Sequence, residues 1–337
     1  MSDSGSLFND DDLFGSSEPV VRETRQSEPE SAPYAARYSN SRIKPISLDG
    51  LNPMQREAAE HVNGPLLVVA GAGSGKTRVL THRIAHLISN HGVSPMNVLA
   101  ITFTNKAAGE MKHRVESLIG PVAKSMWVST FHSACVRILR VHAERIGYPK
   151  TFSIYDQADA QRLTGYVIRD MGLDAKRFTP RAVHAVISNW KNELVSPSQA
   201  AEQAAHIFDR KHSEIYREYQ ERLLKAGAMD FDDLLVNVVR LFRMHPDVLA
   251  SYQDRFKYIL VDEYQDTNIA QNEIVLSLAA RHHNVCVVGD TDQSIYAFRG
   301  ADFRNIGQFE DAFDEVSVVV LEQNYRSTQN ILDAANA

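Results

Sequence analysis

The stretch AGAGSGKT, residues 70–77, has the residue types of a phosphate-binding loop and follows an apolar run at 65–69. The usual pattern G-x-x-x-x-G-K-[ST] has glycine where this chain has Ala70. Glycines in such a loop let backbone N–H groups turn towards phosphate oxygens at the start of a helix. Lys76 would reach the terminal phosphates, and the Thr77 hydroxyl would bind Mg²⁺. The stretch therefore predicts a nucleotide site, with these loop residues: Ala72, Gly73, Ser74, Gly75, Lys76 and Thr77.

A second stretch, YILVDEYQD, supplies the carboxylates that a phosphate-binding loop needs for hydrolysis. Four apolar residues lead into Asp262, so this carboxylate is expected at the end of a strand, where it would hold the metal. Glu263 is suited to orient or deprotonate an attacking water molecule. Two surface acids after a strand are the alternative interpretation. Together with the loop, the pair predicts hydrolysis of a bound nucleotide with Mg²⁺ at Thr77 and Asp262.

The elements around these motifs indicate an α/β fold. Short runs rich in β-branched residues are nearly continuous in apolar character, which is typical of strands buried on both faces of a parallel sheet. Helical patterns separate several of them, so helices are expected on both faces of that sheet. The runs lie at 66–69, 98–102, 127–130, 258–261, 285–288 and 316–321.

Between about residues 136 and 254 the chain shows no comparable strand run, and apolar residues recur at helical spacing. This segment is predicted as an all-helical insertion into the sheet domain, with helices near 158–171, 182–190, 214–224 and 231–242. The sheet domain would then consist of two parts, at 46–135 and 255–337.

The first 45 residues are rich in Ser, Glu, Asp and Pro, and are predicted to be a disordered acidic tail. Residues 1–30 contain eight acids and two bases, which accounts for the whole formal charge of −6. The rest of the chain balances at 34 acids and 34 bases, since 42 − 8 = 34 and 36 − 2 = 34. The overall charge is therefore compatible with a local basic groove.

The chain shows none of the sequence features that direct a protein into or across a membrane. No apolar stretch approaches the roughly 20 residues needed to span a bilayer, and the N-terminus is acidic where a signal peptide is basic. A cytoplasmic location without a membrane partner is expected. Cys135 and Cys286 lie in apolar surroundings, so buried reduced thiols are expected rather than a disulfide.

Two stretches mix aromatic and basic residues at the ends of predicted strands: TFTNKA and SIYAFRG. Rings that stack on bases beside cations that neutralise phosphate are suited to single-stranded nucleic acid of any sequence. The alternative interpretation is that the aromatic residues belong to the core. The candidates in these stretches are Phe103, Asn105, Lys106, Tyr296, Phe298 and Arg299.

In sequence order, the motifs include LNPMQREAA, AGAGSGKTR, ITFTNKAAGEM, VSTFHS, VDEYQD, VVGDTDQSIYAFRG and LEQNYRST. Together they resemble the UvrD/Rep/PcrA family of superfamily 1 DNA helicases, and within it the actinobacterial members. The resemblance covers about residues 47–337. It implies a recA-like motor domain, driven by ATP, that moves 3′ to 5′ along single-stranded DNA and unwinds it at junctions with duplex in repair or replication.

The resemblance also implies roles for individual residues of the nucleotide site. Gln55 matches the glutamine that reads adenine, and Arg78 is expected near the nucleotide. Tyr325 matches the aromatic residue that stacks on the base. Arg326 matches the arginine that contacts the γ-phosphate, and Gln293 the glutamine that senses it.

On the DNA side, Thr130 and His132 match positions that contact the strand in this family. Without the resemblance, His132 would be interpreted as a core histidine. Family members commonly have tryptophan at the position of Phe298, so the stacking surface would be smaller here.

Helicases of this family close an ATP site between two recA-like halves, and only the first is expected within 337 residues. The sequence is therefore expected to be an N-terminal fragment that requires the second motor half as its partner. An alternative from another class is a regulatory module that binds ATP and single-stranded DNA without turnover. The sequence does not indicate other protein partners.

Overall fold

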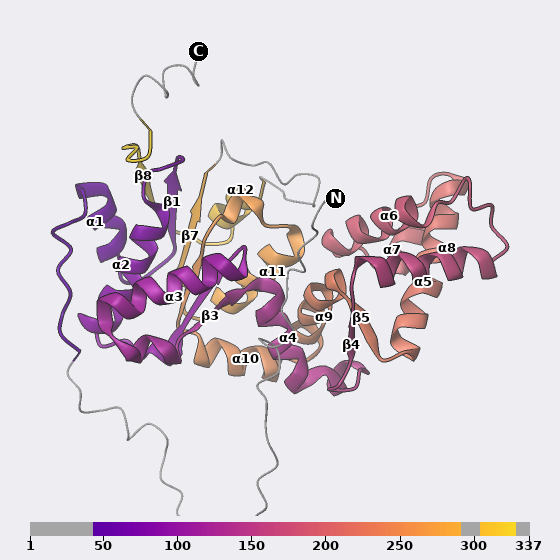
Figure 1. The fold of residues 1–337 in the computed structure, drawn as a ribbon, viewed down its shortest axis with the longest axis horizontal. Coiled ribbons are helices and arrows are strands. Elements are labelled where there is room, and N and C mark those ends of the chain that lie inside the picture. Colours follow the sequence, from indigo (N-terminus) through magenta and orange to yellow (C-terminus); the bar gives the residue numbers. More distant parts are fainter. Residues whose placement is uncertain (1–42, 291–303, 328–337) are drawn as a thin grey trace, which may run out of the picture. The chain divides into compact units, whose positions relative to one another are not determined.

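The computed structural model describes residues 43–290 and 304–327, and its centre is a six-stranded sheet (Figure 1). The strand order is β3-β2-β6-β7-β1-β8, and every neighbouring pair is parallel. The parallel sheet and its predicted strands are confirmed to within a residue or two. The strands are β1 (Leu66–Ala70), β2 (Val98–Thr102), β3 (Trp127–Thr130), β6 (Tyr258–Val261), β7 (Val285–Gly289) and β8 (Ser317–Leu321).

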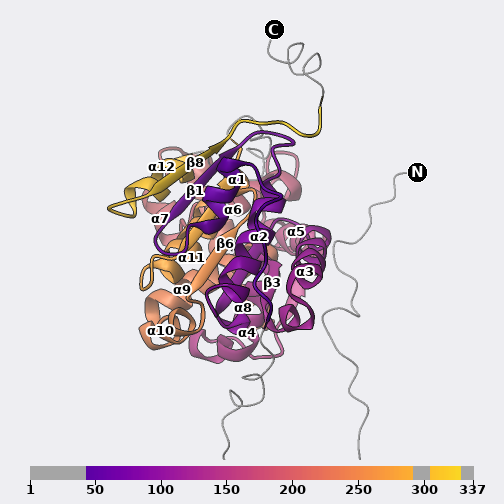
Figure 2. The same ribbon diagram turned by 90° about the vertical axis from the view of Figure 1, so that its left-hand side faces the viewer.

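Helices cover both faces of the sheet because the chain leaves its centre in two directions. Through α2 (Lys76–Ser89) and α3 (Asn105–Ile119) it runs from β1 to β2 and β3, and through α11 (Ile269–Ala279) and α12 (Arg304–Asp311) from β6 to β7 and β8. Parallel crossovers are right-handed, so opposite directions place these helix pairs on opposite faces (Figures 1 and 2). The direction reverses between the neighbours β1 and β7, which is where open α/β sheets bind ligands.

Further helices complete the sheet domain. Three of them, α4, α9 and α10, share one buried apolar core with the strands and α11. Their first turns are fixed by polar caps: the Thr130 side chain accepts the Ser133 N–H at the start of α4, and Asp230 accepts the Asp233 N–H at the start of α9. The helices are α1 (Pro53–Glu60), α4 (Phe131–His142), α9 (Phe231–Met244) and α10 (Pro246–Arg255), with short 3₁₀ turns at Pro95–Asn97, Pro121–Ser125, Ala143–Ile146 and Tyr264–Asp266.

The insertion between β3 and β6 contains a second apolar core of its own. It is formed by α5 (Gln157–Asp170), α6 (Pro180–Asn192), α7 (Pro197–Glu202) and α8 (Ile207–Lys225). We call these four helices the helical subdomain. The predicted helices are present, but α8 begins seven residues before its expected start at 214. The expected start was too late because the first two residues of α8, Ile207 and Phe208, are exposed and do not continue the apolar face.

The expectation of an all-helical insertion needs one correction. Strands β4 (Ser153–Tyr155) and β5 (Ala228–Asp230) form a parallel two-stranded sheet inside it. Three residues are too few to show a strand periodicity, and the pairing is decided by tertiary contact between segments about 75 residues apart. The expected boundary at residue 136 falls inside α4, and the division of the chain into domains stays a prediction.

Two other expectations concern the whole chain. Cys135 and Cys286 are free and buried, as expected, and burial raises the pKa of the Cys286 thiol to about 11. Among residues 43–290 and 304–327, no helix is long and apolar enough to cross a membrane. The acidic tail predicted at 1–45 lies almost wholly outside the described residues.

Candidate nucleotide site and nucleic-acid face

The phosphate-binding loop connects β1 to α2 in the strand–loop–helix arrangement that its motif requires. Gly73 and Gly75 have left-handed backbones, with φ of +76° and +90°, and Gly75 is the N-cap of α2. A Cβ on Gly75 would lie 2.7 Å from the Gln55 Nε2 atom. The loop therefore needs glycine here for conformation and for space. Its N–H groups lie at the positive end of α2, where a phosphate is favoured.

Gln55 holds the loop from α1. Its Nε2 donates to the Ser74 carbonyl at 2.9 Å, and its Oε1 accepts the Asn52 N–H at 3.2 Å. The Ser74 hydroxyl in turn donates to the Gly71 carbonyl at 2.7 Å. An amide has a second N–H and a second lone pair, so the predicted reading of adenine by Gln55 stays compatible with this supporting role.

Lys76, the first residue of α2, extends between two carboxylates. Its Nζ atom lies 3.5 Å from Glu263 Oε2 and 3.4 Å from Asp290 Oδ2, and the side chain is 10% exposed. Asp290 directly follows β7 and was missed in the sequence analysis. The signal was available, because VCVVGD ends an apolar run in an acid as YILVD does.

Asp262 lies directly after β6 and is nearly buried, with its Oδ1 accepting the Glu263 N–H at 3.1 Å. Burial, and then the charge of Glu263, raise the pKa of Asp262 to about 7. The same causes raise the pKa of Asp266 to about 6, and its buried Oδ1 has no hydrogen-bond partner among the described residues. Among the described residues, four carboxyl groups thus lie near Lys76, those of Asp262, Glu263, Asp266 and Asp290.

This group of carboxyl oxygens fits Mg²⁺, a hard cation that prefers oxygen ligands. In the described ranges no three His, Cys, Asp or Glu side chains are grouped as a metal site. Mg²⁺ usually takes only one or two carboxylates and completes its shell with water and substrate phosphate. The predicted ligands Thr77, in the first turn of α2, and Asp262 suit that mode of binding.

Glu263 is fixed by its backbone and by a neighbour that the sequence analysis missed. Its φ of +51° lies in the left-handed region, which is uncommon for a residue with a side chain. Gln265 donates from Nε2 to Glu263 Oε2 at 2.9 Å, and its Oε1 accepts the Asp290 N–H at 2.9 Å. The buried Gln265 amide thus orients the carboxylate and connects it to the end of β7.

The segment after β8 packs against the phosphate-binding loop. Asn324 Nδ2 donates to the Ala72 carbonyl at 2.7 Å, and the Tyr325 N–H donates to the Gly73 carbonyl at 2.9 Å. A Cβ on Gly73 would lie 2.5 Å from the Cβ of Arg326, so the contact requires glycine. Asn324 is a further residue that the sequence analysis did not select.

Tyr325 and Arg326 are both exposed beside the loop. The Tyr325 hydroxyl accepts from Asn52 Nδ2 at 2.8 Å, next to Gln55 on α1. The two predicted base-binding residues therefore lie on the same side of the loop. Arg78 is exposed, and its guanidinium donates to the Gly50 carbonyl at 2.8 Å.

The predicted DNA-binding residues that the structure describes follow β2 and β3. Phe103 is half-buried, Asn105 and Lys106 are exposed at the start of α3, and Thr130 caps α4. The His132 ring packs edge-to-face on Phe231, with the ring centroids 5.8 Å apart, and burial lowers its pKa to about 4.

A pKa of about 4 leaves His132 neutral near pH 7, so the contacts of its ring are uncharged. The other predicted residues, Gln293, Tyr296, Phe298 and Arg299, lie outside the described residues. All the described candidates except Gln55 lie at or just beyond the carboxyl ends of parallel strands, which meet at one edge of the sheet.

A parallel sheet with a phosphate-binding loop at its switch point, and acids ending two neighbouring strands, defines a P-loop nucleotide-binding domain. The chain matches the UvrD/REP helicase N-terminal domain over residues 51–314, and it belongs to that family. The family resemblance inferred from the sequence motifs is thus confirmed.

The chain is similar to proteins named ATP-dependent DNA helicase PcrA from three bacteria. It is 55% identical over 289 residues to that of Bacillus subtilis, which covers 86% of this chain and 39% of the relative. The identity is 52% for Staphylococcus aureus, covering 86% and 40%, and 53% for Staphylococcus epidermidis, covering 85% and 39%. The chain thus spans about two-fifths of the length of these relatives.

Proposed function

We propose that this chain forms an ATP-hydrolysing motor domain of a DNA helicase, which moves 3′ to 5′ along single-stranded DNA and opens junctions with duplex. The observation that carries the proposal is the position of Lys76 between Glu263 and Asp290, at the switch point of the sheet. The names of the relatives support it. Repair or replication in the cytoplasm is the proposed setting, and a second motor half is the proposed partner.

ATP binding would begin with an exchange of partners at Lys76. The two ion pairs of its ammonium group are long, at 3.4 and 3.5 Å, so phosphate oxygens can replace them at little cost. The loop N–H groups would take the phosphates at the start of α2. Tyr325 would stack on the base, and Gln55 would read the adenine edge.

Hydrolysis would depend on Glu263, freed from Lys76 by that exchange. Its carboxylate, held by Gln265, would accept a proton from the attacking water molecule. Arg326 is exposed beside the loop, where its charge can approach the γ-phosphate. Mg²⁺, held by Thr77 and Asp262, would neutralise charge on the phosphate oxygens.

DNA would bind at the neighbouring strand ends. Phe103 would contribute a stacking surface and Lys106 a phosphate contact, and neither depends on the base sequence. Stacking contributes roughly 1–3 kcal/mol per base. Thr130 and neutral His132 would add uncharged contacts. Such an interface suits a protein that steps along DNA of any sequence.

The test is phosphate release from Mg-ATP by the 337-residue chain, with and without oligo(dT), together with binding of a fluorescent ATP analogue. The proposal is supported if the wild-type chain binds both the analogue and oligo(dT), if Lys76→Ala loses binding of the analogue, and if Lys106→Ala loses binding of oligo(dT). Release stimulated by oligo(dT) identifies a motor that works with this half alone. Binding of both without release, in this chain and in a protein of the relatives' full length, would favour the regulatory module instead.

A further inference from the structure

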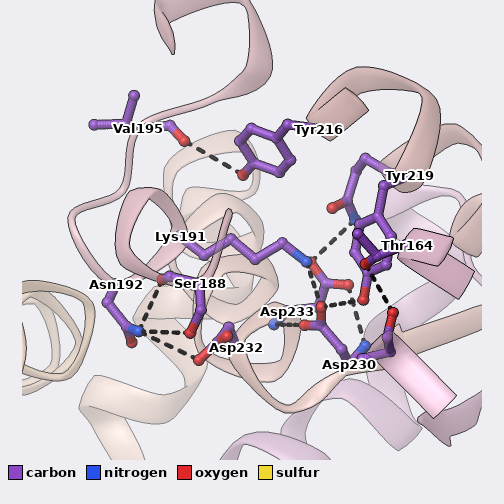
Figure 3. A network of polar contacts seen from close by, with 12 residues as sticks. Thr164, Ser188, Lys191, Asn192, Val195, Tyr216, Tyr219, Asp230, Asp232 and Asp233 are labelled. Atoms are coloured by element: carbon purple, nitrogen blue, oxygen red, sulfur yellow. Dashed lines mark hydrogen bonds and ion pairs between the residues drawn. The ribbon is translucent and has the colours of Figure 1, made fainter. Parts of the chain in front are cut away.

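The helical subdomain meets the sheet domain through buried polar groups at the end of α6. Lys191 is 1% exposed, and its Nζ lies 2.7 Å from Asp230 Oδ2 and 2.8 Å from Asp233 Oδ1 (Figure 3). The Tyr219 hydroxyl donates to the same Asp230 oxygen at 2.8 Å. This cluster ties α6 and α8 of the subdomain to β5 and α9.

Asn192, the next residue, extends the polar contacts in another direction. Its Nδ2 donates to the Ser188 carbonyl at 2.8 Å and lies 3.4 Å from Asp232 Oδ1 (Figure 3). Its Oδ1 accepts from Asn268 Nδ2 at 2.6 Å, and both side chains are buried. The Asn192–Asn268 bond joins residues 76 positions apart in the chain.

Asn268 belongs to the segment that carries the catalytic carboxylates. It is the N-cap of α11, where its Oδ1 accepts the Gln271 N–H at 2.8 Å. It also ends the turn 262–268, which starts at Asp262. Thr267, the residue before it, is held by Asn305 of α12, whose Nδ2 donates to the Thr267 carbonyl at 2.7 Å. The turn is therefore supported at its end by α6 and α12.

A buried hydrogen bond constrains geometry more than apolar packing does. A hydrogen bond requires particular distances and angles, and a buried amide that loses its partner keeps the cost of its lost hydration. The Asn192–Asn268 bond thus fixes the end of the turn relative to the last residue of α6. The Lys191 cluster holds that end of α6 in place, so the constraint reaches the turn from the subdomain.

We propose that Asn192 is a positioning residue for ATP hydrolysis, acting from the helical subdomain through Asn268 on the turn that carries Asp262, Glu263 and Gln265. This rests on the proposed function of the turn. The seating of the helical subdomain then sets how rigidly the general base is held, and a partner or DNA that shifts the subdomain changes turnover without touching ATP.

The first experiment compares Asn192→Ala with Asn189→Ala in the 337-residue chain. Asn189 is an exposed residue of the same helix, so the control makes the same change in residue type without touching Asn268. Hydrogen exchange is measured by mass spectrometry without nucleotide, at the Asp266 and Thr267 amides, which bond inside the turn. We expect exchange about five- to tenfold faster in Asn192→Ala, the range for a lost buried hydrogen bond, and no change in Asn189→Ala.

A second variant separates the turn from the helix end. In Asn192→Ser the hydroxyl can still donate to the Ser188 carbonyl four residues earlier, but it is too short to replace the bond to Asn268. Faster exchange in the turn with unchanged exchange in α6 supports the proposal. Exchange that changes only in α6, in either variant, overturns it.

Turnover supplies the functional readout. Where the wild-type protein hydrolyses ATP, Asn192→Ala is expected to lower kcat about three- to tenfold with KM within twofold, because Lys76 and the loop that bind ATP are unaltered. An unchanged kcat overturns the positioning role. A wild-type chain that binds no ATP analogue refutes the proposed function instead, while the exchange data still decide whether Asn192 holds the turn.

Discussion

Two lysines of this chain, Lys76 and Lys191, are each enclosed by acidic side chains, but they are held in different ways. Lys191 makes ion pairs of 2.7 and 2.8 Å with Asp230 and Asp233, and a tyrosine hydroxyl completes the cluster. Lys76 makes two of 3.4 and 3.5 Å at the edge of the sheet. The short pairs suit a permanent joint, and the long pairs suit a lysine that exchanges its partners for phosphate.

In both regions, several acidic side chains among the described residues lie near one lysine. Asp262 lies beside the phosphate-binding loop, and Asp232 lies near Lys191 and Asp230. The pKa of each is raised to about 7, mainly by burial and to a smaller extent by a neighbouring carboxylate. In the loop region these acids lie at the carboxyl edge of the sheet, where we propose that Mg²⁺ and ATP bind. Position in the fold, rather than residue type, distinguishes the proposed nucleotide site at Lys76 from the buried cluster at Lys191.

The largest expected effect is on chemistry at Lys76. Lys76→Ala should lower the rate of ATP hydrolysis at least about a hundredfold, the scale for loss of one preorganised charge contact in an active site. Phosphate release is the measurement, with Lys124→Ala, an exposed lysine, as control. Wild-type turnover in Lys76→Ala would refute the assignment of the site.

The largest effect on stability is expected at the other lysine. Lys191→Met should lower the free energy of unfolding by about 3–5 kcal/mol, because it leaves the buried Asp230 and Asp233 without their cation. Urea denaturation measures the change. Lys225→Met, at an exposed lysine of α8, should cost less than about 1 kcal/mol. Similar losses in both variants would contradict the contrast between a joint and a surface pair.

A smaller catalytic effect is expected at Gln265, which holds Glu263 without touching ATP. Gln265→Met keeps the volume and removes both hydrogen bonds, so kcat should fall roughly tenfold while KM stays within about twofold. Steady-state kinetics separate the two constants. Gln203→Met, at an exposed residue, is the control, and a rise in KM at constant kcat would show that Gln265 serves binding instead.

The smallest effect is expected at Asp232 and depends on pH. Its folded-state pKa of about 7 lies above the ordinary value of 3.8, so the stability due to its protonation is complete below about pH 4 and is lost as the pH rises through 7. Asp232→Asn imitates the protonated form. Its melting temperature should exceed that of the wild type by a few degrees at pH 8 and match it at pH 4. Asp314→Asn, an exposed acid, should show no such trend.

Much of the sheet domain could be predicted because buried parallel strands leave a strong local signal. Runs such as 98–102 and 258–261 are apolar throughout and end at polar residues, and the structure places both strands as expected. The loop at 70–77 could likewise be located from its motif and its flanking strand and helix. In these segments the local sequence pattern and the observed element agree.

The contacts that arrange the site could not be predicted in the same way. The bond between Asn192 and Asn268 joins two elements whose meeting depends on the packing of the whole insertion. Gln265 carried no signal beyond its place two residues after Glu263, and its second contact, to Asp290, spans 25 residues. The three-residue strand β5 was not predicted for the same reason, since it becomes a strand only by pairing with β4.

The strand order has a consequence for the synthesis of the protein on the ribosome. Among the described residues, β1 pairs only with β7 and β8. Leu66 therefore cannot pair with Cys286 or Ser317 until these residues have been synthesised. Roughly 200 residues must be translated after β1 before it has a neighbour, which at 5–20 residues per second takes about 10–40 seconds. During that interval an apolar strand is unpaired on the nascent chain, and the helical subdomain, whose residues are contiguous, is the part that can fold first.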